Sequence, residues 1–215
     1  SDSFGEEETY LDADPVNLSI CPTCLEEIFD KDSDSFLNHA KRCELCSVKN
    51  ITDTPLEQIG LGLKPSDKQV LFEEFAKSFV QNGSATFLSH SGFVTIFSDP
   101  NPDIEYALAF SVEDLSSSFF MSEDELLLLN SIERPYVKLL TKAQSPLKNA
   151  GFNTIDVSIA SCAMSYIVLY FLKKIGVDVV YARSGEFAES KLFLKTNLGD
   201  ELPIYSCAIS KKRLI

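Results

Sequence analysis

The chain is poor in several residue types: among its 215 residues are no tryptophan, two histidines, two methionines and six cysteines. It is also short of positive charge, because 19 Lys and Arg stand against 32 Asp and Glu, which gives a formal net charge of −13. Contact with nucleic-acid phosphates requires a basic surface. Nucleic-acid binding by the chain as a whole is therefore not expected, and the composition favours a protein partner.

The sequence lacks the long apolar run of a membrane-spanning helix, which needs about 18 or more residues. Its closest candidate, residues 157–172, is sixteen residues long and contains three serines. We therefore expect a buried helix over 157–175 rather than a membrane span. The opening residues also lack the basic and apolar regions of a secretory signal. These absences favour an intracellular protein.

Common catalytic signatures are missing too, including a Gly-rich phosphate loop, a G-x-S-x-G elbow and an H-E-x-x-H pair. Outside residues 21–46 the cysteines are Cys162 and Cys207, and the histidine is His90. We interpret both cysteines as buried and the histidine as a turn residue, and we predict a protein that is not an enzyme. An alternative is a cysteine hydrolase that uses Cys162 and His90, which would require an activated thiol.

After residue 65 the sequence alternates between helical and strand-like periodicity. An amphipathic helix is expected from Ser66 to Gly83, followed by an antiparallel three-stranded meander over residues 85–112. A helical segment over 122–143 opens with the capping box Ser122…Glu125 and breaks near Arg134, because Pro135 follows. After the helix at 157–175, a second three-stranded meander is expected over 177–182, 190–196 and 202–210.

These patterns predict an α+β protein: a small ββα-like zinc finger followed by an α+β domain with two antiparallel three-stranded meanders and three to four helices. Residues 1–34 carry eleven acids against the single Lys31. We expect an acidic flexible arm over 1–19, the finger over 20–48, a Pro- and Gly-containing linker over 49–65 and the α+β domain over 66–215.

The finger is predicted from four cysteines and a histidine within residues 21–46. Zinc takes four thiolate or imidazole ligands in a tetrahedron, and two cysteines two residues apart supply two of them. The spacing C-x2-C-x14-H-x3-C predicts Cys21, Cys24, His39 and Cys43 as ligands, with the last two on one face of a short helix. Replacement of His39 by Cys46 gives C-x2-C-x18-C-x2-C, a second accepted zinc spacing.

The segment "CPTCLEEIF…SFLNHAKRC" resembles the UBZ class of ubiquitin-binding zinc fingers, over about 25 of the 215 residues. The resemblance implies a ββα module whose helix contacts ubiquitin, with Ala40, Lys41 and Arg42 at the partner-binding surface. The C2HC form of the family carries an acid two positions after the histidine, where this chain has Lys41. At Ala40 the family usually has a larger aliphatic residue.

The resulting expectation is a non-enzymatic adaptor with a structural Zn²⁺, which recognises ubiquitin or ubiquitinated partners in a DNA-damage or quality-control pathway, in the nucleus rather than the cytoplasm. The resemblance alone carries the ubiquitin and nuclear parts. The alternative is a scaffold subunit of a nuclear multiprotein complex, in which the finger packs against the large domain or a partner subunit and is purely structural.

Overall fold

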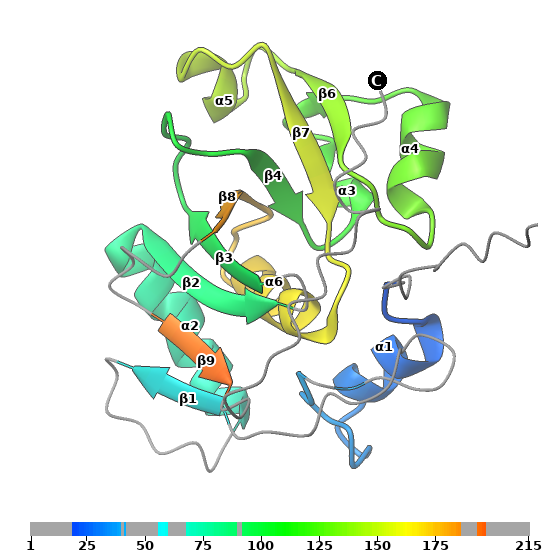
Figure 1. Ribbon diagram of the computed structural model, residues 1–215, viewed down its shortest axis with the longest axis vertical. Coiled ribbons are helices and arrows are strands. Elements are labelled where there is room, and N and C mark those ends of the chain that lie inside the picture. The colour runs from blue at the N-terminus through cyan, green and yellow to red at the C-terminus, as the bar shows by residue number, and fades with distance from the viewer. Residues whose placement is uncertain are drawn as a thin grey trace, which may run out of the picture.

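The computed structural model describes residues 19–39, 41, 56–59, 68–89, 92–185 and 193–196. Within these ranges the chain forms six helices and nine strands (Figure 1). The helices are α1 Pro22–Phe29, α2 Lys68–Asn82, α3 Val112–Leu115, α4 Glu123–Asn130, α5 Pro146–Asn149 and α6 Ala163–Lys174. The strands are β1 Leu56–Ile59, β2 Ser84–Ser89, β3 Gly92–Phe97, β4 Tyr106–Ala109, β5 Phe119–Phe120, β6 Val137–Thr141, β7 Thr154–Ile159, β8 Val179–Ser184 and β9 Phe193–Thr196. The predicted α+β class is confirmed.

The strands join one mixed sheet in the order β1-β9-β2-β3-β8-β4-β7-β6-β5. The first predicted meander is right in its β2–β3 hairpin, which is antiparallel, and wrong in its third strand. Strand β8 lies between β3 and β4 and runs antiparallel to both, while β4 pairs with β7 in parallel. The second meander is wrong in its first pair, because β9 pairs with β1 and β2 rather than with β8. Its third strand, over 202–210, lies outside the described residues. Side-chain periodicity marks each strand but does not identify its partner.

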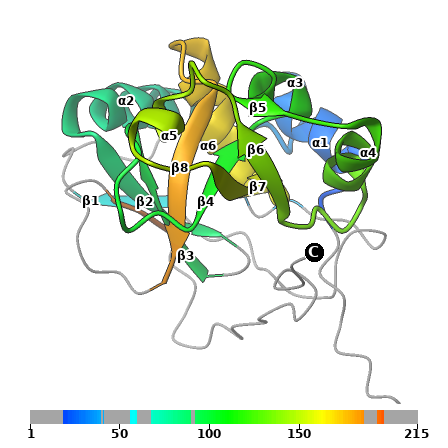
Figure 2. The ribbon, with the colours of Figure 1, turned by 90° about the horizontal axis from the view of Figure 1, so that it is seen from above.

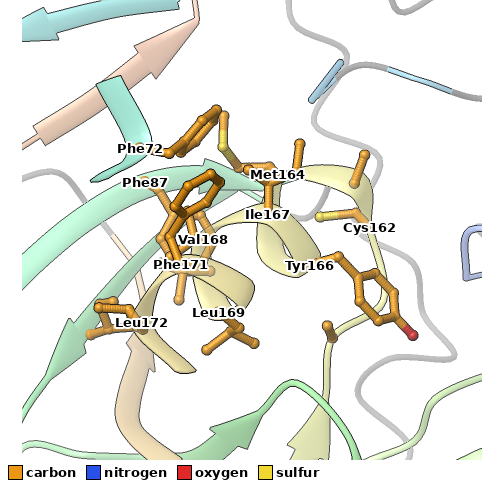
Figure 3. Close-up of a cluster of buried hydrophobic side chains, with 14 of the residues drawn as sticks. Phe72, Phe87, Cys162, Met164, Tyr166, Ile167, Val168, Leu169, Phe171 and Leu172 are labelled. Atoms are coloured by element: carbon orange, nitrogen blue, oxygen red, sulfur yellow. The ribbon is translucent and has the colours of Figure 1, made fainter. Parts of the chain in front are cut away.

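Each face of the sheet supports its own hydrophobic core, because side chains alternate between the two faces. On β4, Tyr106 and Leu108 enter the core beneath α2 and α6, whereas Ala107 and Ala109 enter the core with α3, α4 and α5. Figure 3 shows the first core around α6, with Phe72 of α2 and Phe87 of β2 against that helix. The second core covers the β7-β6-β5 end of the sheet, where α4 lies beside β6 and β7 (Figure 2).

The apolar run predicted as one helix over 157–175 is divided between β7 and α6. Strand β7 contains the β-branched residues Thr154, Ile155, Val157 and Ile159, which favour extended backbone. Helix α6 begins only after Cys162 and is buried along most of its length. The prediction of a buried helix is confirmed for residues 163–174, and its predicted start was wrong. Among the residues described, no helix is long and apolar enough to cross a membrane.

Two predicted helix boundaries agree with the structure. The Ser122 side chain accepts a hydrogen bond from the Glu125 amide at 3.3 Å, and the Ser122 amide donates to the Glu125 carboxylate at 2.7 Å. This is the predicted capping box. Helix α6 ends before Gly176, whose φ of +87° suits glycine. Helix α4 ends at Asn130, and the residues after Pro135 form β6 rather than a further helix.

The expected ββα order is not found in residues 19–41. The first element is helix α1, which begins at Pro22 directly after Cys21, and no strand is present among the described residues of this segment. Residues 31–39 form turns, and Leu37 has a φ of +51°, which a continuous right-handed helix cannot contain. Residues 56–59 of the predicted linker form β1. The proposed domain boundaries remain predictions.

Candidate functional site

The predicted thiol pair lies at the N-terminus of α1. Proline suits the first position of a helix because its missing N–H needs no partner there, and Pro22 occupies that position. The turn places the amide of Cys24 3.5 Å from the Cys21 sulfur, which accepts its hydrogen bond. Cys24 is 1% exposed and Cys21 is half-buried. The segment therefore holds two sulfurs on one tight turn, as a metal knuckle requires.

The predicted third ligand, His39, is buried at the end of the turn region rather than on a helix. Leu37 anchors this region, because its side chain is fully buried and its amide donates to the Ile28 carbonyl at 2.9 Å. A spacing of four residues brings two ligands onto one face only in a helix. The described backbone up to His39 is not helical, and residues 40, 42 and 43, which would complete the pairing with Cys43, lie outside the described residues.

The two possible ligand sets differ in how much of each is described. Among the described residues, no group of three or more His, Cys, Asp or Glu side chains is arranged to hold a metal ion. Three members of the set with His39 are described, namely Cys21, Cys24 and His39 itself. The set with Cys46 has only two described members, since Cys43 and Cys46 lie outside the described residues. Both sets, and zinc itself, remain predictions.

The predicted partner-binding residues lie mostly outside the described chain, as Ala40 and Arg42 do. Lys41 is described, and its ammonium lies 2.5 Å from the Glu27 carboxylate of α1. The Lys41 side chain is 23% exposed, so it is held against α1 rather than extended into solvent. This ion pair connects Lys41 to α1. We define residues 19–41 as the cysteine-containing segment.

The cysteine-containing segment packs directly on the large sheet-bearing part of the chain. The ring of Phe29 lies 4.6 Å from that of Tyr170 on α6 and 6.0 Å from that of Phe110. The backbone continues this contact, since the Ile20 amide donates to the Ser161 carbonyl at 2.9 Å. The buried side chains of the segment, Ile20, Cys24, Ile28 and Leu37, belong to the same hydrophobic core as α2 and α6.

Only Cys162 of the hydrolase alternative is among the described residues. Cys162 is 5% exposed and its sulfur lies 3.4 Å from the Ser165 hydroxyl, at the N-terminus of α6. The same hydroxyl accepts from the Cys162 amide at 3.1 Å. His90 and Cys207 lie outside the described residues. A reactive Cys162 remains an untested alternative.

Sequence reasoning did not identify Arg134 as a site residue. Its φ is +47°, which is uncommon for arginine, and its Nη1 donates to the Leu129 carbonyl at 2.9 Å. Its Nε is buried with no hydrogen-bond partner among the described residues. Burial raises the pKa of Tyr166, while the charge of Arg134 and a hydrogen bond from it oppose that rise. Figure 3 shows Tyr166 pointing away from Phe72, on the other side of α6.

The signal for Arg134 was present in the sequence only as a helix break before Pro135. A partly buried cation beside the start of a buried helix depends on tertiary packing, so local periodicity could not reveal it. The same is true of the contact between Phe29 and α6.

No family model matches the sequence, and no curated protein matches it. Solved structures similar in fold include two of HypF. Full-length HypF in a phosphate- and nucleotide-bound form matches 83% of this chain and 26% of its own, with a TM-score of 0.54 and 17% identity. HypF from T. kodakarensis matches 83% of this chain and 27% of its own, with a TM-score of 0.53 and 16% identity. The match to E. coli YciO has a TM-score of 0.44 and 13% identity, over 54% of this chain and 63% of that one.

These matches concern fold, because the identities are low. The chain spans about a quarter of the length of the two HypF proteins. Neither the activity nor the ligands of the longer proteins follow from this likeness. The chain shares its fold with part of HypF.

Proposed function

We propose that this chain is a non-enzymatic scaffold subunit in which the cysteine-containing segment has a structural role. The observation that carries the proposal is the contact of Phe29 with Phe110 and Tyr170, at 6.0 and 4.6 Å between ring centroids. A module that recognises a partner by itself would keep its apolar surface for that partner. Here the apolar face of α1 is used inside the molecule.

The extent of this contact supports a structural role. Cys24, Ile28 and Leu37 are 0–1% exposed and share the core of α6. Burial of one large aliphatic side chain contributes about 1.5–3 kcal/mol. Because a typical domain is stable by only about 5–15 kcal/mol, loss of this packing would weaken the whole fold.

Zinc fits this role as a proposed cofactor. Cys21 and Cys24 would hold it together with Cys43 and either His39 or Cys46. The two described sulfurs have a donor set suited to zinc, since both lie on one turn and one accepts an amide hydrogen bond. When bound, zinc supplies folding free energy by joining chain segments that bury little apolar surface alone.

Ubiquitin recognition is the more specific version of the proposal and draws on the family resemblance. Its helix would present Ala40, Lys41 and Arg42. The Lys41–Glu27 ion pair favours the structural alternative, because a partner that used Lys41 would have to compete with Glu27. Exposed ion pairs contribute only about 0–1 kcal/mol, so this competition alone would not prevent binding.

A titration of isotope-labelled full chain with ubiquitin separates the two versions. The structural version predicts no shift of the amides of residues 19–41 at millimolar ubiquitin. Shifts confined to residues 38–43 would overturn it in favour of ubiquitin recognition, and Lys41→Glu, which restores the acid of the family, should then strengthen them. Lys77→Glu is the matched control, because Lys77 is an exposed, ion-paired lysine on α2.

A second candidate function is binding of a phosphate-containing small molecule. The supporting observation is Arg134, whose buried Nε has no hydrogen-bond partner among the described residues. A guanidinium binds phosphate oxygens through several N–H groups at once. One of the HypF structures with a similar fold is in a phosphate- and nucleotide-bound form. This motivates the choice of ligand. That match covers only 26% of HypF and does not locate the bound groups.

Calorimetric titration of the full chain with ATP and with inorganic phosphate tests this candidate. If Arg134 binds phosphate, Arg134→Gln should weaken affinity at least about tenfold, which corresponds to about 1.4 kcal/mol. Lys77→Gln removes a distant exposed cation and should leave affinity unchanged. Absence of binding to the wild-type chain, or equal loss in both variants, would exclude the candidate.

A further inference from the structure

Helix α4 and the second residue after its end present large apolar side chains to solvent. Leu127 is 71% exposed, Leu128 is 36% exposed and Ile132 is 51% exposed. Leu127 and Leu128 are adjacent on α4, and Ile132 follows Ser131, whose ψ of 159° ends the helix in extended backbone. We call these three residues the α4 face.

The fold does not need this face. Helix α4 contacts the sheet through Leu129, which is fully buried in the core beside β6 and β7. Leu126 packs against the same core. The inward contact is therefore complete without Leu127, and a polar residue would serve equally well at that position. Grouped apolar side chains on a surface commonly mark a contact with another molecule.

The surroundings of the α4 face are acidic. Residues 122–133 contain the acids Glu123, Asp124, Glu125 and Glu133, and no Lys or Arg. Glu125 is used in the capping box with Ser122. The next cation along the chain, Arg134, directs its Nη1 to the Leu129 carbonyl and the Asn130 side chain. Negative charge thus dominates this face.

The described chain also begins at this face. The Ser19 amide donates to the Ile132 carbonyl at 3.1 Å, so the preceding residues are joined to the molecule at this point. Residues 1–18 contain six acids and no Lys or Arg.

We propose that the α4 face binds a basic amphipathic segment of a partner protein. Apolar side chains of that segment contact Leu127, Leu128 and Ile132, while its Lys and Arg side chains lie against Glu123, Asp124 and Glu133. This assignment rests on the proposed function as a scaffold and gives that scaffold a docking surface. A second copy of this chain is disfavoured, because two acidic faces would repel each other.

The test uses a helical peptide of about fourteen residues, built from Leu at i, i+3, i+4 and i+7 with Lys elsewhere. It is titrated into isotope-labelled full chain. Amide shifts should map to residues 123–133, and Leu127→Ser should weaken binding about tenfold. Val80→Ser is the matched control, because Val80 is 54% exposed on α2, and it should change affinity less than about twofold.

A scrambled peptide of the same composition separates apolar docking from charge attraction, and it should bind at least about tenfold more weakly. The proposal is overturned if the scrambled peptide binds equally well, or if the shifts map away from α4. It is also overturned if the wild-type chain self-associates in sedimentation and Leu127→Ser abolishes that, since the occupant is then a second copy. The ubiquitin titration tests residues 19–41 and does not involve the α4 face. The proposed function and the proposed docking surface can therefore fail independently.

Discussion

The ring centroids of Phe29 and Tyr170 lie 4.6 Å apart. This contact joins the cysteine-containing segment to α6, a helix that is buried along most of its length. The two residues are far apart in sequence and belong to α1 and α6. Their contact makes a segment predicted as an independent module a part of the principal core. The stability of the segment and of the sheet should therefore be coupled.

Replacement of Phe29 by alanine should destabilise the entire fold. Phe29 is partly buried between Phe110 and Tyr170, so the expected loss of unfolding free energy is about 2–3 kcal/mol, below the usual range for a fully buried phenylalanine. Urea denaturation monitored by far-UV circular dichroism measures it. Val80→Ala, on exposed α2 surface, should cost less than about 0.5 kcal/mol. Equal effects of the two substitutions would show that α1 is uncoupled from the sheet.

The zinc prediction distinguishes Cys24 from Cys162, two cysteines that are both buried. Natively purified chain should contain about one zinc per molecule by plasma mass spectrometry, because structural sites bind four ligands from one chain. Cys24→Ser should remove the metal and lower the melting temperature. Cys162→Ser, the matched control, should retain it. A wild-type chain purified without metal would contradict the prediction.

Alkaline pH should destabilise the fold through its buried tyrosines. Burial raises the pKa of Tyr181 to about 12 and the pKa of Tyr106 well above its usual value. The folded state therefore holds these protons more tightly than the unfolded state, whose tyrosines have a pKa near 10. The stability that these protonated hydroxyls contribute is fully present below pH 10 and decreases as the pH rises towards 12.

Tyr181→Phe tests this relationship because it removes the titrating hydroxyl while keeping the ring. The variant should lose less unfolding free energy than the wild type between pH 9 and pH 11 in urea denaturation. Superimposable pH profiles for the two proteins would refute the assignment to Tyr181.

Gly176→Ala should destabilise the chain by about 1 kcal/mol. Nothing lies within 4 Å of an added Cβ at this position, so the cost comes from the backbone φ of +87° rather than from a clash. Thermal unfolding measures the change. Gly151→Ala provides a second glycine with open space and a φ of +90°, so it should show a similar loss. A stabilised Gly176→Ala variant would contradict this explanation.

Local features of the fold were predictable from sequence. The capping box at Ser122 and the glycine after α6 depend on neighbouring residues, so they were identified correctly. The order of strands was not predictable, because the insertion of β8 between β3 and β4 depends on contacts between distant segments. The run over 157–175 was assigned to one helix, since an apolar stretch does not distinguish a buried strand from a buried helix.

The candidate site was predictable only in part. The thiol pair Cys21 and Cys24 was recognised from its spacing, and the structure places both at one turn. The helix expected around His39 was wrong for residues 35–39, because Leu37 turns the chain there in order to enter the core. Arg134 was missed, since its importance arises from contact with Leu129 and Tyr166 rather than from a motif.

Hydrogen exchange of the full chain tests the shared core most directly. Peptides covering residues 22–29 and 163–174 are compared by mass spectrometry under native conditions, where the slowest amides open with the free energy of global unfolding. If α1 belongs to the core of α6, the most protected amides of both peptides should exchange with the same opening free energy, and Phe29→Ala should lower both together. Rapid exchange of residues 22–29 while residues 163–174 stay protected would contradict the account.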